Sequence, residues 1–531
     1  MTAAAPSRSA ADPTCQSGRV NADPEQPRAR RWVPEATGAA TAAALAITTV
    51  ALVAASPRAE LLFRDADSLV TTLVVRSLAV GQRQDWAMSS VLFLPETATV
   101  ALLTAVGLGV AGTLALAAVL NLIALYGAFR VAAGARGRSP APVAGALLGF
   151  GAFCLFAVTE GSVSRDALEP ASLLLTTTYY SATVIAAVLA VGIAGRGLEA
   201  PRRGWAPWTI AAVAAASVLT NPLFAAWAGI PLIAVLAVVA LRGRGSGAPR
   251  LVVAVAVGCA AGFVLRMPLA GLIANTGAGY ADPSRALESL GYYAQLAAER
   301  WNSPGGAVAV IAGVALWLWC GVAAVVLARR RETGAFVVAA FGWIAPVLVV
   351  VGAIGLGTHA ARYLQPIAFA PVVGLVVLPR LTPRVALPRT LGAVLAGAAA
   401  VALVLAGAIG IPRIAASATA PDADLDCVVA WTDASGRTGA GQFWTVRLPK
   451  AHVADPRSLV QVDHELRGYA WLVDRDDFAV GEVTFLVLDA QSPAFELPPG
   501  TSMDDAELVP CGRYTIADFG ERALPLGPQR S

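Results

Sequence analysis

The sequence predicts an α-helical bundle embedded in a membrane, followed by a small β-rich domain at the C-terminal end. Hydrophobic residues make up 56% of the 531 residues and charged residues only 14%, whereas a soluble domain carries about 25% charge. The apolar residues gather in long runs, each close to the roughly 20 residues that a helix needs to cross a bilayer. From Pro412 onward the composition becomes that of a soluble domain.

Three regions follow from this pattern. Residues 1–31 are rich in Ala, Pro, Ser and Arg and have no apolar period, so we expect a disordered tail on the cytoplasmic side. Residues 32–411 form the membrane domain, and residues 412–531 form a domain outside the cytoplasm. The membrane domain contains eleven candidate spans: 36–56, 108–131, 141–159, 172–195, 206–221, 223–241, 250–268, 305–328, 334–355, 364–379 and 390–411.

Arginine placement predicts the orientation of these spans. The five connections expected on the cytoplasmic side hold fourteen arginines and only two acidic residues, Glu199 and Glu332. The opposite connections hold nearly all the other acidic residues of the membrane half. Because basic residues are retained on the cytoplasmic side during insertion, we expect the N-terminus inside and the C-terminus outside, in the cell membrane.

The C-terminal domain contains short runs of strand-forming residues between Gly, Pro and Asp. We expect strands over 443–448, 469–473 and 483–488, in a small sheet or sandwich. Its aromatic residues either fill a core or form a platform on which carbohydrate stacks. Cys427 and Cys511 bracket the domain, and two cysteines in an exported domain favour a disulfide over two free thiols.

Two outer connections, 57–104 and 266–303, are long enough to build a site. The first contains Arg64, Asp65, Asp67 and Glu96. Carboxylates near a bilayer lose solvation, which raises their pKa and suits them to act as general bases. Two Asp residues at i and i+2 can share a divalent cation such as Mg²⁺ or Mn²⁺, and arginines beside them can hold a phosphate. The alternative is that these are ordinary solvated charges.

Three segments carry a family resemblance. The segment Asp65-Ala-Asp67 lies about nine residues beyond the first span, 358–366 reads Thr-His-Ala-Ala-Arg-Tyr-Leu-Gln-Pro, and 441–447 reads Gly-Gln-Phe-Trp-Thr-Val-Arg. This layout resembles the GT-C class of integral membrane glycosyltransferases, which have an acidic motif in the first outer loop and often a C-terminal domain outside the cytoplasm.

The resemblance implies a polyprenyl-phosphate sugar donor and a carboxylate base. It points to Asp65 and Asp67 as catalytic or cation-binding residues, with Arg64, Glu96, His359, Arg362 and Tyr363 as substrate-binding residues. The acceptor would be an envelope glycan or protein. A non-catalytic envelope assembly protein is the main alternative. A transporter is disfavoured because ionisable residues are sparse within the spans, and no basic cluster interleaved with aromatic residues supports nucleic-acid binding.

Overall fold

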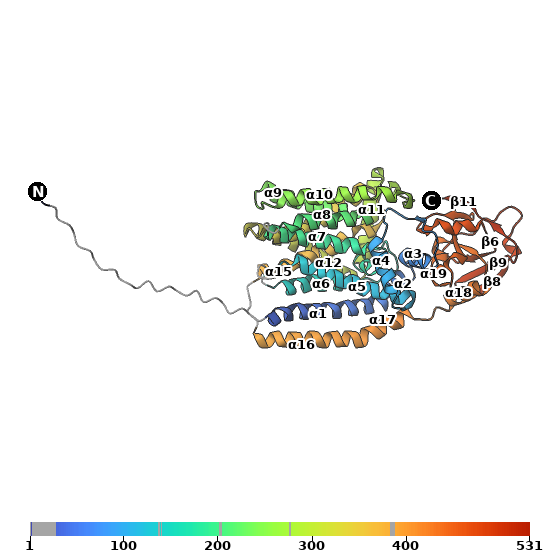
Figure 1. Ribbon diagram of the computed structural model, residues 1–531, viewed down its shortest axis with the longest axis horizontal. Coiled ribbons are helices and arrows are strands. Elements are labelled where there is room, and N and C mark those ends of the chain that lie inside the picture. Colours follow the sequence, from blue (N-terminus) through green and yellow to red (C-terminus); the bar gives the residue numbers. More distant parts are fainter. Residues whose placement is uncertain are drawn as a thin grey trace.

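The computed structural model describes Thr2, Ser139 and residues 28–135, 141–200, 204–275, 278–382 and 388–530. Its helices lie side by side in an elongated bundle, and a domain containing most of the strands sits at one end (Figure 1). We call this the domain end of the bundle. The predicted tail, 1–31, falls almost entirely outside the described residues, since the first helix begins at Arg28.

The bundle is built from apolar helices. Their bounds are α1 (Arg28–Ala54), α5 (Gly109–Ala132), α6 (Pro142–Val158), α7 (Ser181–Glu199), α8 (Trp205–Thr220), α9 (Ile230–Leu241), α10 (Ala248–Leu265), α12 (Pro304–Arg329), α13 (Thr333–Gly355), α14 (Pro366–Gly374), α15 (Leu378–Leu381), α16 (Arg389–Leu405) and α17 (Ile411–Ala418). In the described part of the chain, eight helical stretches are long and apolar enough to cross a membrane. The predicted spans 141–159, 206–221 and 223–241 correspond to shorter apolar helices of 16 or 17 residues.

Small residues let these helices approach closely. A Cβ at Gly258 of α10 would lie 2.5 Å from the carbonyl oxygen of Ala211 on α8, and one at Gly145 of α6 would lie 2.3 Å from that of Val376. Such contacts between backbones are typical of helices packed inside a bilayer, where small side chains permit close van der Waals contact. Cys154 and Cys320 are likewise buried between helices.

The predicted span 172–195 is wrong at its start, because α7 begins only at Ser181. Residues 172–175 form a 3-10 turn and Tyr180 adopts φ 70°, so the chain is not a regular helix there. Polar contacts explain the difference: the Thr177 hydroxyl lies 2.8 Å from the Thr71 hydroxyl, and Gln365 donates to the carbonyl of Tyr179. These tertiary hydrogen bonds outweigh the preference of an apolar run for helix.

Two long connections lie at the domain end. The first contains α2 (Ala59–Phe63), α3 (Val70–Ala79), β1 (Trp86–Ala87) and α4 (Leu94–Thr104). The second contains α11 (Ala286–Trp301), preceded by 3-10 turns over Met267–Leu272, Ala278–Tyr280 and Pro283–Arg285. Figure 1 shows α2, α3 and α4 between the bundle and the C-terminal domain.

The C-terminal domain is a mixed sheet with α18 (Ala423–Ser435) and α19 (Phe443–His452) packed on one face. The sheet order is β11-β4-β3-β2-β7-β9-β8, with β2 parallel to both its neighbours. The strands are β2 (Gly439–Gln442), β3 (Leu459–Val462), β4 (Arg467–Tyr469), β5 (Val473–Asp474), β6 (Glu482–Val483), β7 (Phe485–Leu488), β8 (Glu507–Cys511), β9 (Tyr514–Asp518), β10 (Leu524–Pro525) and β11 (Gly527–Arg530). The predicted Cys427–Cys511 disulfide is confirmed, with a Cα–Cα distance of 5.5 Å.

The strand expected over 443–448 is wrong, because these residues begin helix α19. Val446 packs against the sheet, while Phe443 and Leu448 pack against the membrane bundle. A helix that is buried on two sides has apolar residues around its circumference and no clear apolar stripe. The helical period is therefore not visible in the sequence, and the strand-forming residues favour a strand. The strand expected over 483–488 is confirmed as β6 and β7, and the segment 469–473 contributes the ends of β4 and β5.

The C-terminal domain is fixed to the first connection by backbone pairing and buried charge. Strand β1 pairs with β5, with Trp86 opposite Asp474. Lys450, the only lysine of the chain, lies 2.8 Å from Asp477, which also accepts a hydrogen bond from Gln82 at 2.6 Å. The domain and the loops of the bundle therefore share one interface.

Candidate functional site

Asp65 and Asp67 lie in the turn that follows α2, at the interface with the C-terminal domain. Helix α2 ends at Phe63, and the turn is held by the Ser68 hydroxyl, which donates to the carbonyl of Leu61 at 2.5 Å. Asp65 accepts hydrogen bonds from the Ser68 amide at 3.2 Å and the Tyr179 hydroxyl at 2.9 Å. The Asp65 side chain is 9% exposed and that of Asp67 is 21% exposed, so both carboxylates are largely enclosed.

The pKa of Asp65 is raised to about 6, chiefly by burial and to a smaller extent by the nearby charge of Asp67. Arg165, the Tyr179 hydroxyl and the Ser68 amide oppose this rise because they stabilise the ionised form. The two carboxylates therefore differ in environment: Asp65 is anchored by hydrogen bonds, while Asp67 is the more open.

Arg165, from the loop after α6, lies among three carboxylates. Its guanidinium is 3.6 Å from Asp65, 3.7 Å from Asp67 and 3.7 Å from Asp166. The same guanidinium lies over the ring of Trp444 in the C-terminal domain, 4.3 Å from the ring centroid. Arg165 thus contacts both the aspartate turn and the C-terminal domain.

Arg362 completes the cluster from a third loop. It lies in the 3-10 turn before α14 and donates to Asp166 at 2.7 Å. Its guanidinium also lies 5.3 Å from the centroid of the Tyr363 ring. Two arginines and three aspartates from three separate loops consequently meet at the domain end.

A small cavity of about 60 Å³ opens beside this cluster. Asp67 and Arg362 line it together, and aromatic side chains form much of its wall: Phe93, Tyr179, Tyr180, Tyr280, Tyr363 and Trp471. Thr178 also lines it, and the Thr178 hydroxyl is buried without a hydrogen-bond partner among the described residues. The lining, with aromatic walls and a few polar groups, is of the kind found in ligand sites, while the volume is well below the roughly 300 Å³ of a typical ligand pocket.

Three of the predicted substrate-binding residues do not line this cavity. Arg64 turns away and lies 3.3 Å from Asp422 and 3.7 Å from Glu60. His359 lies 3.4 Å from Glu288. Glu96 is buried in α4, where it accepts a hydrogen bond from the amide of Ala182 at 3.2 Å.

Burial raises the pKa of Glu96 to about 7. Phe93, which precedes α4, lines the cavity, whereas Glu96 in the first turn of α4 does not. Of the predicted residues, the structure brings together Asp65, Asp67, Arg362 and Tyr363.

Sequence reasoning assigned no role to Arg165, Asp166, Tyr179 or Trp471. Arg165 and Asp166 lie in a short loop that resembles an ordinary charged connection. Tyr179 falls inside an expected span, although the preceding run of three threonines is polar enough to signal an interruption. Trp471 reaches the cavity from the C-terminal domain, more than 400 residues from the aspartate turn.

The sequence predicts that Asp65 and Asp67 can share a divalent cation. Among the described residues, no group of three or more His, Cys, Asp or Glu side chains is arranged to hold a metal ion. Arg165 contacts all three aspartates and supplies the positive charge there.

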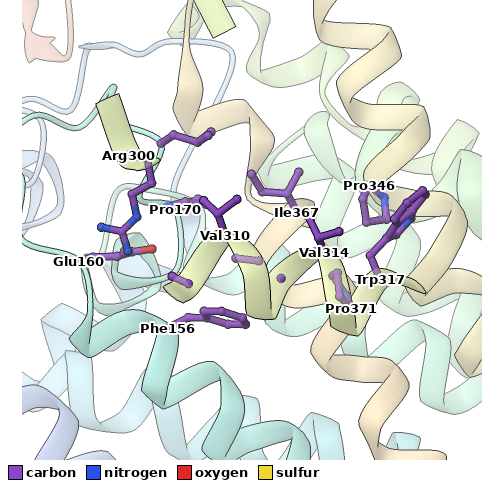
Figure 2. Close-up of a pocket in the computed structure, with 14 residues that line it drawn as sticks. Phe156, Glu160, Pro170, Arg300, Val310, Val314, Trp317, Pro346, Ile367 and Pro371 are labelled. Carbon is purple, nitrogen blue, oxygen red and sulfur yellow. The ribbon is translucent and has the colours of Figure 1, made fainter. Parts of the chain in front are cut away.

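An apolar groove of about 250 Å³ lies between α6, α12, α13 and α14. Figure 2 shows Glu160 and Arg300 together at one end and Trp317 and Pro346 at the other, with Phe156, Val310 and Val314 between. The polar end is electrically balanced, since Arg300 lies 2.5 Å from Glu169 and Arg58 lies 3.7 Å from Glu160.

The loop over 160–171 separates this groove from the aspartate cluster. Leu168 and Pro170 line the groove, while Asp166 of the same loop contacts Arg362. One loop therefore borders both the groove and the aspartate cluster.

Comparison with known proteins adds no assignment: no family model, no curated protein and no solved structure matches the chain.

Proposed function

We propose that the protein is a membrane glycosyltransferase that moves a sugar from a polyprenyl-phosphate donor to an acceptor of the cell envelope. The observation that carries the proposal is the shared cavity of Asp67 and Arg362. A carboxylate and a guanidinium from distant loops face one space with aromatic walls, at the end of a membrane bundle. This pairs a proton acceptor with a group that can compensate a phosphate.

The chemistry assigns a role to each residue. The acceptor hydroxyl loses its proton to the Asp67 carboxylate as its oxygen bonds to the anomeric carbon of the sugar. The bond between that carbon and the phosphate oxygen breaks, and its electron pair leaves with the polyprenyl phosphate. Arg362 compensates the charge of the departing phosphate. Asp65, held by Tyr179 and Ser68, fixes the turn that presents Asp67.

The apolar groove supports a lipid-linked donor. Three of its four helices, α12, α13 and α14, belong to stretches that are long and apolar enough to span a membrane, and α6 is a shorter apolar helix, so an isoprenoid chain is a fitting occupant. The loop that carries Asp166 borders both the groove and the cluster, so the phosphate of such a lipid would lie near Arg362. The unused hydroxyl of Thr178 offers a hydrogen bond to a sugar hydroxyl.

The proposal includes the orientation of the chain. We count the eight long helices and three of the four shorter apolar helices, α3 being left out, as eleven spans, with the N-terminus in the cytoplasm and the domain end outside. The excess of arginine in the opposite connections supports this orientation. Reporter fusions after Ser531 and before Met1 test it, and an active cytoplasmic reporter at Ser531 would overturn it.

One observation favours a non-catalytic assembly protein as the second candidate. Arg165 contacts all three aspartates, so the cluster is already charge-paired in the absence of ligand. In that case the aspartates would hold the C-terminal domain in place, and their substitution would lower stability without affecting any transfer reaction.

Substitution of the aspartates separates the two candidates. In membranes supplied with polyprenyl-phosphate sugars, Asp67→Asn should lower transfer by about 10²-fold or more, the typical contribution of a general base. Asp65→Asn should lower it less. Asp426→Asn, at an exposed position on α18, is the matched control. Full transfer by Asp67→Asn at normal abundance would overturn the catalytic assignment.

A further inference from the structure

Three arginines meet at one small hollow, at the end of the bundle away from the C-terminal domain. Helices α9 and α12 end there and α13 begins there, and Figure 1 shows α9 at that end. Arg242 and Arg244 follow α9, and Arg331 lies between α12 and α13. The rest of the lining is apolar apart from Thr333. We call this feature the arginine hollow.

The protein does not balance the positive charge of the arginine hollow. At the same end of the bundle, Glu35 pairs with Arg130. Glu199 and Glu332 both pair with Arg380. Within the described part of the chain, no carboxylate forms an ion pair with the three arginines of the hollow. Retention of arginine on one side of a membrane does not require three arginines from two connections to share one hollow.

Hydrogen bonds hold the two connections against each other. The guanidinium of Arg244 donates to the carbonyl of Ala328 at 3.1 Å, and the Thr333 hydroxyl donates to the carbonyl of Arg244 at 3.0 Å. The hollow is therefore formed before any ligand arrives. A preformed site lowers the entropy that binding would otherwise cost.

Arg331 adopts a backbone conformation that favours glycine. Its φ is 59°, and it lies directly after α12, where glycine is the usual residue. Gly243 takes the equivalent place after α9, with φ 63°. A residue with a large side chain strains the backbone at such a position, and residues held in this way cluster at ligand sites. We infer that Arg331 is present for its side chain.

The size and surroundings of the arginine hollow indicate an amphiphile with an anionic head. Its volume is about 10 Å³, which is room for about one water-sized group, so a single phosphate oxygen fits while the rest of the ligand lies outside. Guanidinium groups bind such oxygens through charge-assisted hydrogen bonds. Leu241 on α9 is 87% exposed, and Val322 and Val325 on α12 are 59% and 53% exposed. Acyl chains would cover these apolar side chains.

We propose that the arginine hollow binds the phosphate of an anionic phospholipid, whose acyl chains lie against α9 and α12. Basic pockets between membrane helices bind anionic head groups in this way. A soluble phosphate would satisfy the arginines but leave the apolar side chains beside them uncovered. The hollow and the aspartate cluster lie at opposite ends of the bundle, so the lipid site does not depend on the proposed function.

Binding is measured on the full chain in detergent by native mass spectrometry, with phosphatidylglycerol as the probe. Arg242→Gln, Arg244→Gln and Arg331→Gln should each raise the Kd about fivefold, and the triple variant about 100-fold. A matched triple variant removes the same charge from the same end of the bundle without touching the hollow, by replacing Arg250, Arg329 and Arg330 with Gln. It should bind the lipid as the wild type does. Equal losses in the two triple variants would overturn the site, because general charge attraction would then explain the binding.

Two further probes test the chemical class of the ligand. Phosphatidylcholine is zwitterionic and should bind about tenfold more weakly than phosphatidylglycerol; equal affinities would contradict an anionic site. Glycerol 3-phosphate has the charge without the acyl chains, and binding of it as tight as that of the lipid would identify a soluble phosphate site instead.

Arg331→Gly separates binding from folding. Glycine suits the backbone at this position, so the melting temperature should stay at or above that of the wild type, while the Kd for phosphatidylglycerol rises about fivefold. A lower melting temperature with unchanged lipid binding would show that the Arg331 side chain serves the fold and not a ligand.

Discussion

Arg447 Nε donates a hydrogen bond to the carbonyl oxygen of Ala66 at 2.8 Å, across 381 residues of sequence. Ala66 lies between the two aspartates of the cluster, and Arg447 is fully buried in the C-terminal domain. A second nitrogen, Nη1, donates to the carbonyl of Leu472 at 2.5 Å. One guanidinium therefore sets the distance between the aspartate turn and the segment that carries Trp471.

Arg447→Met should lower both stability and transfer. The substitution leaves the buried carbonyls of Ala66 and Leu472 without this donor, which costs about 1–3 kcal/mol for each unsatisfied group. We expect a lower melting temperature in detergent and at least tenfold slower transfer in membranes. Arg457→Met is the control, because Arg457 is 56% exposed and pairs only with the nearby Asp455 among the described residues. A wild-type melting temperature for Arg447→Met would contradict the role given to this side chain.

Arg362→Gln should weaken donor binding, whereas Arg64→Gln should not. Both arginines are predicted phosphate ligands, but only Arg362 lines the cavity, and Arg64 pairs with Glu60 and Asp422. Loss of a charged hydrogen bond to phosphate corresponds to about tenfold or more in the KM for the donor. The measurement is the donor KM of both variants in membranes, and equal effects at the two positions would contradict the assignment.

Asp65 should make stability depend on pH. Its pKa is raised from 3.8 to about 6 in the folded protein, mainly by burial. The folded state therefore binds this proton more tightly than the unfolded chain does. The resulting stabilisation is fully present below about pH 4 and is lost as the pH rises through 6. The shift corresponds to about 3 kcal/mol.

The melting temperature from pH 4 to pH 7 checks this prediction. Asp474 and Glu96 also have raised pKa values, so the wild type and Asp65→Asn must be compared directly. The Asp65→Asn curve should fall less steeply over this range, because asparagine does not titrate. Parallel curves would show that Asp65 does not hold a proton preferentially in the folded state.

The Cys427–Cys511 disulfide should stabilise the C-terminal domain. It closes a loop with a sequence separation of 84 residues, and constraining the unfolded chain in this way contributes about 4 kcal/mol in the chain-entropy model. We expect Cys427→Ala to lower the melting temperature of the full chain and Cys259→Ala, at a partly buried free cysteine, to change it little. Protection of Cys427 from alkylation until a reductant is added would verify the bond itself.

The membrane helices could be predicted because length and composition suffice for an apolar span. The two errors arose where tertiary contacts override local preference. Residues 176–180 leave the helix because Thr177 and Tyr179 bond to other elements. Residues 443–448 form a helix because α19 is buried between the sheet and the bundle.

The site was predictable only where position along the chain carried information. Asp65 and Asp67 follow a span, and Arg362 and Tyr363 precede another, so each lies at a membrane boundary. Arg165 contacts Asp65, which is 100 residues earlier in the sequence, and Trp444, which is 279 residues later. Contacts between residues so far apart in the sequence depend on how the helices pack. Arg64 has the residue type expected of a phosphate ligand, but the direction of its side chain could not be foreseen.

The pairing of β1 with β5 has a consequence for biosynthesis. The pairing of Trp86 with Asp474 cannot form until Asp474 has been translated. At common rates of synthesis, this takes about 20 to 80 s after Trp86 is made. During that delay the aspartate turn lacks Arg447, Trp444 and Trp471. A chain cut short before β5 can still insert its helices, yet it has no finished site. The interface around the aspartate turn is therefore complete only after the chain has been synthesised through β5.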